Sequence, residues 1–327
     1  MRAPAFWRDD CALSRLLSPL GAIYGRFAGE RLSREAPRAP LLAIVVGGLT
    51  TGGDGKTPLV LALARLLAAR GEKPALLTRG FGRKRETAQP IAVDLNRHQA
   101  ADVGDEALLL ARAALTIVGA DRLASAALAQ RRGATCLILD DGFHSRRVAA
   151  DLALLAIDAD YGAGNGRCLP AGPLRAPLDA QFTAADMLVV IGDGARGTAI
   201  AEGAHKPYAR ARLVAEPEAA KALKDARVVA FAGVARPEKF FRTVEACGAE
   251  IVARAPFGDH HRFTDNDYAA LSALRQKFGA HLVTTEKDAA RIGARMATLG
   301  ASTLPVTLAF DDVGALDAAL ARLNRAS

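Results

Sequence analysis

A glycine-rich segment over residues 47–58 has the composition to bind a ligand through its backbone. It reads Gly-Gly-Leu-Thr-Thr-Gly-Gly-Asp-Gly-Lys-Thr-Pro. An apolar run over 41–46 precedes it, and apolar residues at helical spacing follow it from Leu59 onward. A strand, a glycine-rich loop ending in Gly-Lys-Thr and a helix form the P-loop arrangement, in which backbone N–H groups and the helix N-terminus bind phosphates. The sequence therefore predicts a nucleotide site here.

Two side chains of this loop have expected roles of their own. Lys56 is expected to reach the terminal phosphates, and the Thr57 hydroxyl is expected to bind magnesium. Thr50 stands where the strict motif has glycine, which favours a P-loop subfamily with its own loop shape. The alternative is a glycine-rich turn that binds nothing. The loop residues predicted to bind nucleotide are Thr50, Thr51, Gly52, Gly53, Asp54, Gly55, Lys56 and Thr57.

Two adjacent carboxylates, Asp140 and Asp141, end an apolar run over 136–139. A carboxylate at the C-terminal end of a strand next to a P-loop is typical of a magnesium site. Asp158 ends another apolar run and is the rival candidate. We prefer the first pair because a Gly-Phe turn that could open a site follows it. An aspartate at a strand end can also be a helix cap.

Asp105 lies in a Val-Gly-Asp-Glu stretch before an apolar helical segment over 107–114. It could be the base that accepts a hydroxyl proton during phosphoryl transfer. The alternative is a first-turn acid that interacts with the helix dipole.

His260 and His261 are the only adjacent histidines. Neighbouring side chains point in different directions from a strand or a helix, so the two are not expected to bind one metal. One imidazole could reach a carboxylate base. The alternative is a solvated loop histidine.

Several arginines lie at expected strand ends or in glycine-rich loops, where a guanidinium can bind phosphate with two hydrogen bonds. Arg79 and Arg122 are predicted to bind the nucleotide phosphates, and each could instead be a surface residue. The loop over 161–175 is rich in Gly and Pro and is expected to border a substrate site, with Arg167 and Arg175 in it.

The net charge of +8 fits an anionic partner: a nucleotide, an anionic lipid or a nucleic acid. No basic helix with interleaved aromatic residues supports nucleic-acid binding. The four cysteines form no C-x-x-C pair and are expected to be reduced thiols in a cytosolic compartment. No apolar run approaches the roughly 20 residues that span a bilayer.

The segment over residues 2–34 combines an apolar stripe with arginines. Its stripe consists of Leu13, Leu16, Leu17, Leu20, Ile23, Tyr24 and Phe27. Such a helix can lie in a membrane interface, or it can pack on its own domain. Pro19 is expected to kink it or to split it into two helices.

Apolar runs alternate with helical patterns along the rest of the chain. The expected strands are 41–46, 74–78, 115–118, 136–140, 152–157 and 187–191, with a second set at 227–232, 249–253, 281–284 and 304–309. This alternation predicts an α/β fold of P-loop type with a parallel sheet covered on both faces, and a second, smaller α/β lobe. The expected divisions are an amphipathic segment over 1–38, a P-loop domain over 39–210 and a small lobe over 211–327.

Together these stretches resemble one family, the tetraacyldisaccharide 4'-kinases that act on the lipid A precursor. The matching segments, in the order of the family, are 48–58, 78–82, 103–106, 139–143, 165–175, 259–261 and 284–289. The off-pattern P-loop is itself typical of the family. Departures occur at Phe81, at His144-Ser145 and at Ala176, and they affect the contacts to nucleotide and lipid headgroup more than the reaction class.

The resemblance implies ATP- and Mg²⁺-dependent phosphorylation of the 4'-hydroxyl of tetraacyldisaccharide 1-phosphate, in a cleft between two lobes. It implies that Asp105 is the base, that His260 or His261 is its partner, and that Asp140 and Asp141 are the magnesium and phosphate acids. It also implies a peripheral position at the cytoplasmic face of the inner membrane. Neither nucleic acid nor an obligate protein partner is expected.

A second reading of the same residues is a membrane-associated P-loop ATPase or GTPase switch. The chain has no Asn-Lys-x-Asp motif for reading guanine, and a second lobe suggests a cleft for an acceptor. Both features favour the kinase.

Overall fold

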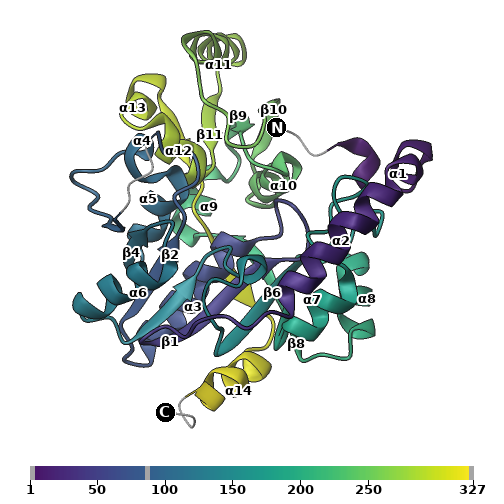
Figure 1. The fold of residues 1–327 in the computed structure, drawn as a ribbon. Helices are drawn as coiled ribbons and strands as arrows, with labels where there is room; N and C mark the ends of the chain where they lie inside the picture. Colours follow the sequence, from purple (N-terminus) through teal and green to yellow (C-terminus); the bar gives the residue numbers. More distant parts are fainter. Residues whose placement is uncertain (1–3, 85–88, 324–327) are drawn as a thin grey trace.

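The computed structural model describes residues 4–84 and 89–323, which form two lobes, each built on its own sheet (Figure 1). The large lobe has nine strands in the order β13-β8-β7-β6-β1-β5-β2-β4-β3. All neighbours are parallel except the pairs β13–β8 and β3–β4. The strands are β1 Leu42–Gly48, β2 Pro74–Thr78, β3 Ile91–Ala92, β4 Leu115–Val118, β5 Cys136–Leu139, β6 Leu152–Asp158, β7 Met187–Ile191, β8 Tyr208–Ala215 and β13 Val306–Phe310.

The central strand β1 explains why this sheet must be covered on both sides. Ala43 and Val45 belong to one hydrophobic core, and Ile44 and Val46 belong to the other. Because successive side chains of a strand point to opposite faces, a strand that is apolar at every position is most stable when both faces of its sheet are shielded from water. Three helices cover one face: α3 Lys56–Ala69, α5 Asp105–Ala111 and α14 Gly314–Leu323. The other face carries α2 Ser18–Leu32, α6 Arg122–Arg131, α7 Leu178–Ala184 and α8 Ala195–Gly203.

The small lobe is a second α/β unit with a four-stranded parallel sheet in the order β10-β9-β11-β12. Its strands are β9 Arg227–Ala232, β10 Glu250–Pro256, β11 His281–Thr284 and β12 Ala301–Thr303. Helices α9 Pro217–Leu223 and α10 Pro237–Ala246 pack on one face, and α11 Asp265–Phe278, α12 Glu286–Ile292 and α13 Arg295–Leu299 pack on the other. The α/β fold class with a smaller second lobe is therefore confirmed.

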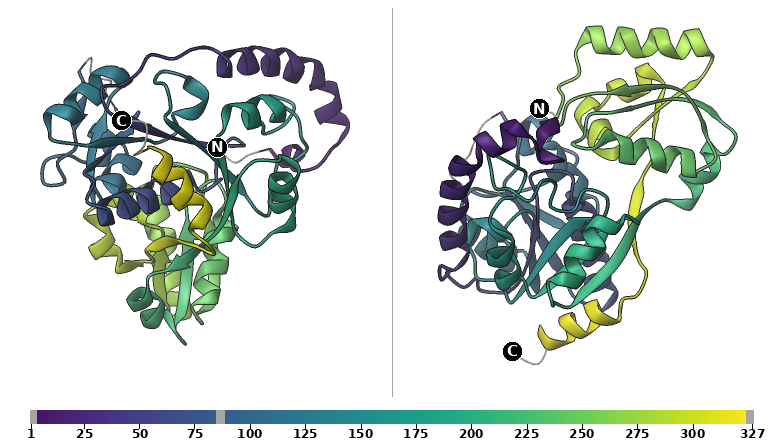
Figure 2. Two further views of the ribbon diagram at one scale, coloured as in Figure 1. Left: turned by 90° about the horizontal axis from the view of Figure 1, so that it is seen from below. Right: turned by 90° about the vertical axis from the view of Figure 1, so that its right-hand side faces the viewer.

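The lobes do not divide where the sequence suggested. The expected boundary between residues 210 and 211 falls inside β8, and the final strand β13 pairs antiparallel with β8 in the large sheet. Helix α14 also packs on the large lobe, through Leu316 and Leu320. The small lobe is thus inserted between β8 and β13, and the chain connects the lobes twice (Figure 2). Hydrophobic periodicity shows that 306–310 is a strand, but it does not show which sheet the strand joins.

The sequence did not predict strand β8, because exposed and buried residues alternate along it. Arg210 and Arg212 are exposed, whereas Ala209 and Ala211 are buried, so the segment lacks a continuous apolar run. Such alternation is normal for a strand near the edge of a sheet.

The N-terminal segment forms two helices, as Pro19 suggested. Helix α1 spans Ala12–Leu16, and Pro19 lies in the first turn of α2, where a proline needs no hydrogen-bond partner for its nitrogen. Small residues of α2 face the protein: a Cβ added at Gly21 would lie 2.8 Å from the carbonyl oxygen of Cys168. The large apolar residues face outward instead.

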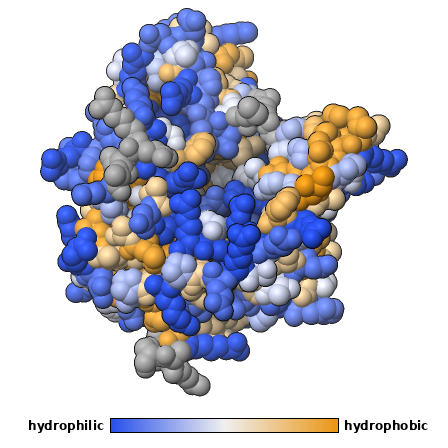
Figure 3. Space-filling model, viewed as in Figure 1, coloured by the Kyte–Doolittle hydropathy of each residue, from blue (hydrophilic) through white to orange (hydrophobic). Residues whose placement is uncertain are grey.

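This outward face forms a continuous apolar patch over α1 and α2, visible at the upper right of Figure 3. Leu16 is 75% exposed and Phe27 is 61% exposed. The other exposed members are Leu13, Leu20, Ile23 and Tyr24. Across residues 4–84 and 89–323, none of the helices has the length and apolar character needed to cross a membrane.

Candidate active site

A cavity of about 830 Å³ lies between the lobes, above the C-terminal ends of β1, β2 and β5. This is where open parallel sheets bind ligands, because the loops that follow the strands meet at that edge. The large lobe contributes Lys56, Thr57, Arg79, Glu106, Arg122, Asp140, Asp141 and Arg175. The small lobe contributes Arg236, Lys239, His260 and Lys287.

The P-loop connects β1 to α3 with glycines in conformations that other residues rarely adopt. Gly52, Gly53 and Gly55 have φ of 84°, 76° and 85°. Gly55 directly precedes α3, and a Cβ there would lie 2.7 Å from Cδ1 of Ile191. The glycines therefore set the backbone path that presents the loop to the cavity.

Thr50 and Asp54 shape this loop from beneath. The backbone N–H of Thr50 donates to Oδ2 of Asp54 over 2.7 Å, and its hydroxyl donates to Oδ1 over 2.6 Å. Both side chains are fully buried, and Thr50 does not line the cavity. Thr50 was predicted to bind nucleotide, whereas its side chain binds the loop itself. The threonine in place of glycine supplies a hydrogen bond that holds the loop in shape.

Asp141 is surrounded by cations. Its Oδ1 lies 2.8 Å from Nη1 of Arg175 and 3.8 Å from Nζ of Lys56. Burial raises the pKa of Asp141, but the charges of Lys56 and Arg175 outweigh it and hold the pKa at about 2. Asp141 is therefore an ionised carboxylate beside the P-loop lysine.

Asp140 has the opposite environment. It is buried, and its Oδ1 has no hydrogen-bond partner among the described residues. Burial, with the nearby charges of Glu106 and Asp141, raises the pKa of Asp140 to about 7. A buried oxygen without a donor is costly for the protein alone and suits a cation ligand.

Thr57 completes this part of the site, since its hydroxyl lies 3.4 Å from Oε1 of Glu106. The described residues contain no cluster of three or more His, Cys, Asp or Glu side chains arranged around a metal. Mg²⁺ commonly takes only one or two carboxylates and fills its other positions with water and phosphate oxygens. The residues present fit a magnesium ion of that kind.

Asp105 is the first residue of α5 and is buried. It does not line the cavity itself, but it contacts His260, which does. Its Oδ2 is 3.4 Å from Nδ1 of His260 and 2.5 Å from Nε of Arg291. Burial raises the pKa of Asp105, but the hydrogen bond from His260 and the charge of Arg291 outweigh it and hold the pKa well below its usual range. Asp105 is thus more than a first-turn acid.

The two adjacent histidines have different partners. Nε2 of His261 lies 3.0 Å from Oδ2 of Asp267, and its ring stacks on Phe257 at 4.8 Å between centroids. His260 instead faces Asp105, and its ring contacts Phe81 at 4.8 Å. Of the pair that the sequence left open, the structure brings His260 to the carboxylate and places His261 in a contact within the small lobe.

The arginines that the sequence placed near phosphate or substrate lie in two different parts of the structure. Arg79, Arg122 and Arg175 line the cavity. Burial lowers the pKa of Arg122 to about 10, and Nη1 donates to the Gly119 carbonyl over 2.9 Å. Arg167 lies elsewhere and binds Asp10 at 3.1 Å, so it fixes the N-terminal segment.

The small lobe supplies cations that sequence reasoning missed. Lys287 and Arg291 of α12 bind Glu106 and Asp105. On the other side of the cavity, two cations of the small lobe, Arg236 and Lys239, both bind Asp158. Asp158, the rival magnesium acid, therefore joins the lobes instead. Of these four cations only Lys287 lies in a stretch that the sequence singled out, Thr-Thr-Glu-Lys-Asp-Ala, which matched the family without a chemical role.

A P-loop at the end of the central strand, two carboxylates on the adjacent strand and a third carboxylate paired with histidine define a P-loop phosphotransferase. The sequence model of the tetraacyldisaccharide-1-P 4'-kinase family matches residues 13–325. The chain belongs to this family of enzymes, which transfer phosphate to a hydroxyl group.

Curated relatives of similar length support the assignment. A tetraacyldisaccharide 4'-kinase of Nitrobacter winogradskyi is 47% identical over 97% of this chain and 96% of its own length. One from Paramagnetospirillum magneticum is 51% identical over 84% of both chains. The crystal structure of LpxK from Aquifex aeolicus in complex with ATP matches with a TM-score of 0.72 over 95% of this chain and 99% of that one. At 24% identity, this last comparison shows a shared fold.

Proposed function

We propose that this protein transfers the γ-phosphoryl group of ATP to the 4'-hydroxyl of a tetraacylated glucosamine disaccharide 1-phosphate, giving lipid IVA in lipid A biosynthesis. The names of its relatives identify the acceptor class. The observation that carries the proposal is that Lys56 of the P-loop and His260 line one cavity formed by both lobes, and that His260 contacts the buried Asp105.

In this proposal ATP binds along the loop from Thr51 to Thr57, with Lys56 on its terminal phosphates. Asp105 takes the proton of the sugar hydroxyl, and the oxygen forms a bond to the γ-phosphorus. The bond between that phosphorus and the β,γ-bridging oxygen breaks, and its electron pair leaves with ADP. Arg79 and Arg122 offset the charge that develops. His260 orients the base.

Mg²⁺ would be held by Thr57, Asp140 and Asp141, and it would neutralise charge on the phosphates. The orphaned oxygen of Asp140 supports its role as a ligand. Asp141 also contacts Lys56, so it links the cation site to the P-loop lysine.

We further propose that α1 and α2 bind the cytoplasmic face of the inner membrane. The exposed apolar patch supports this, because monomeric soluble proteins rarely leave so many large apolar side chains together. Arg26, Arg31 and Arg34 lie in or beside α2 and could meet anionic lipid headgroups. Arg31 also lines the cavity, which connects the patch to the site.

The test is transfer of labelled phosphate from ATP to purified tetraacyldisaccharide 1-phosphate in detergent micelles. We expect magnesium-dependent product from the intact protein and none from Lys56→Ala. Binding of ATP without transfer by the intact protein would reject the kinase and favour a nucleotide switch.

A further inference from the structure

Arg291 has more polar contacts than a surface arginine would. It lies on α12 of the small lobe and is 9% exposed. Its Nη1 donates to the Gly233 carbonyl over 2.6 Å and to Oδ1 of Asp288 over 2.7 Å. Its Nε donates to Oδ2 of Asp105 in the large lobe over 2.5 Å. The guanidinium is thus fixed within its own lobe and donates one N–H group to a carboxylate of the large lobe.

We propose that Arg291 is a positioning residue for the catalytic base, fixing the Asp105 carboxylate against His260 from the opposite lobe. The inference rests on the proposed function of Asp105. Both His260 and Arg291 contact Oδ2. This arrangement leaves Oδ1 as the oxygen that can take a proton, and it prevents the carboxylate from rotating.

The same guanidinium also faces His260. Nδ1 of His260 lies 3.4 Å from Oδ2 of Asp105 and 3.5 Å from Nη2 of Arg291. An arginine in a protein stays protonated and can only donate. A neutral His260 can therefore accept from Arg291, and a protonated His260 can donate to Asp105. Arg291 is the group that holds the pair together in either state.

Because Arg291 belongs to the small lobe and Asp105 to the large one, the base is complete only when the lobes are together. The other charged groups that face Asp105 are His260, Lys287 of α12 and Glu106 of α5. Lys287 binds Glu106 at 2.5 Å, so these two charges offset each other. Loss of Arg291 would therefore leave His260 as the one side chain in direct polar contact with Asp105 among the described residues.

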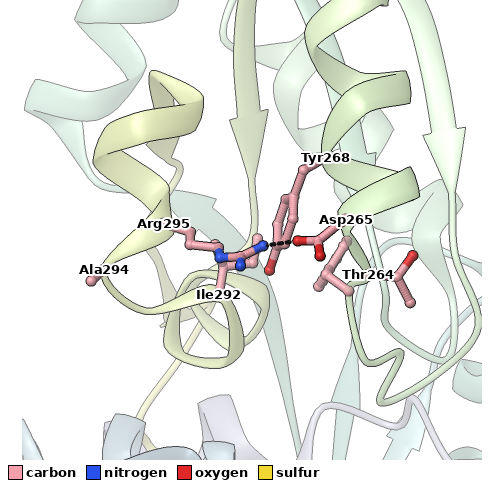
Figure 4. Close-up of a pocket in the computed structure, with 7 residues that line it drawn as sticks. Thr264, Asp265, Tyr268, Ile292, Ala294 and Arg295 are labelled. Carbon is pink, nitrogen blue, oxygen red and sulfur yellow. Dashed lines mark hydrogen bonds and ion pairs between the residues drawn. The ribbon is translucent and has the colours of Figure 1, made fainter.

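The test compares Arg291→Met with Arg295→Met in the full chain. Arg295 lies four residues further on and binds Asp265 on the outer side of the small lobe, next to Tyr268 (Figure 4). These three residues belong to a pocket whose lining residues all come from the small lobe, outside the proposed site. Arg295→Met therefore removes an arginine of the same region without touching the base.

We expect Arg291→Met to lower kcat about 100-fold, the order of loss for a misplaced catalytic group, with the KM for ATP little changed. A base must be ionised, so activity falls as the pH drops through its pKa. Removal of a neighbouring cation raises that pKa, and the acidic limb of the kcat profile should move up by about one pH unit or more. Arg291→Lys should restore part of the rate and of the shift.

Three outcomes would overturn the inference: unchanged kcat, an equal loss at every pH, or the same loss in Arg295→Met. An equal loss of kcat at every pH is what a merely structural role of Arg291 would give. If Arg291→Met does not fold, Arg291→Gln provides the same pH comparison, because glutamine also lacks the positive charge but can still donate hydrogen bonds. An inactive intact protein would instead reject the proposed function, so the two failures are distinguishable.

Discussion

Asp140 and Asp141 are neighbours in the chain, yet the structure gives them different electrostatic roles. Asp141 faces Lys56 and Arg175, whereas Asp140 has an oxygen with no donor among the described residues. At the scale of single residues, the site therefore contains one carboxylate that the protein satisfies and one that it does not. Such unsatisfied groups are common where a ligand completes the structure.

Replacing Asp140 with asparagine should separate stability from function. The change removes a buried carboxylate charge that burial and two neighbouring carboxylates disfavour, so the protein without nucleotide and magnesium should melt higher by roughly 2 °C or more. Magnesium-dependent transfer should fall at the same time, because the amide is a poorer cation ligand. Thermal unfolding in a chelator and the transfer assay measure the two effects. A lower melting temperature would contradict this account of Asp140.

Helix α10 and the P-loop show how one element of the small lobe supports another in the large lobe. Arg236 precedes α10, and its Nη2 donates to the Thr50 hydroxyl over 3.2 Å and to Oδ1 of Asp54 over 3.3 Å. Its guanidinium also lies over the Tyr161 ring at 4.0 Å from the centroid. The P-loop is thus held from beneath by its own side chains and from the facing lobe by an arginine.

Arg236→Met should destabilise the fold and weaken ATP binding. It leaves the buried carboxylate of Asp54 without its arginine, a loss of about 3 kcal/mol in the free energy of unfolding. Arg242→Met is the matched control, because Arg242 is 60% exposed and pairs with Asp160 at the surface. That pair should contribute about 1 kcal/mol or less. Urea unfolding and ATP titration compare the variants, and equal losses in both would contradict the prediction.

The exposed apolar patch on helices α1 and α2 is proposed to bind the membrane, and a charge placed on it tests this contact. Phe27→Glu places a charge on the exposed apolar patch and should weaken binding to anionic vesicles, raising the KM for the lipid but not for ATP. Leu95→Glu is the control, since Leu95 is an exposed leucine outside the patch. Vesicle sedimentation and kinetics measure both. An unchanged Phe27→Glu variant would remove α2 from the membrane contact.

For the whole molecule, the two lobes meet through charges of opposite sign. The cations Arg236, Lys239, Lys287 and Arg291 come from the small lobe, and their partners Asp54, Asp158, Glu106 and Asp105 come from the large one. These pairs lie on both sides of the cavity. The position of the lobes therefore determines both the shape of the P-loop and the setting of the base.

Truncation after residue 305 tests which lobe the chain end supports. It removes β13 and α14, whose Leu308, Leu316 and Leu320 are buried in the large lobe. We expect the large lobe to lose its fold and ATP binding to disappear, as measured by calorimetry and circular dichroism. A truncated chain that still bound ATP would show that the large lobe folds without β13 and α14.

Local chemistry in the sequence determined the class of fold, and it predicted many of the residues of the candidate site. The P-loop and the Asp140-Asp141 pair were predicted because glycine spacing and strand-end carboxylates are set by residues close together in the chain. Asp105 was predicted to be the base through the resemblance to the family. The large parallel sheet followed from apolar runs that alternate with helical patterns.

Tertiary structure alone decided which residues meet. Only the packing of the small lobe against the large one brings His260 and Arg291 to Asp105, or Arg236 to the P-loop. The return of β13 to the large sheet is likewise a long-range pairing. Periodicity indicates which face of an element is buried, but the partner that covers this face is set by the whole fold. The contacts between the lobes and the pairing of β13 with β8 could therefore not be predicted from local sequence.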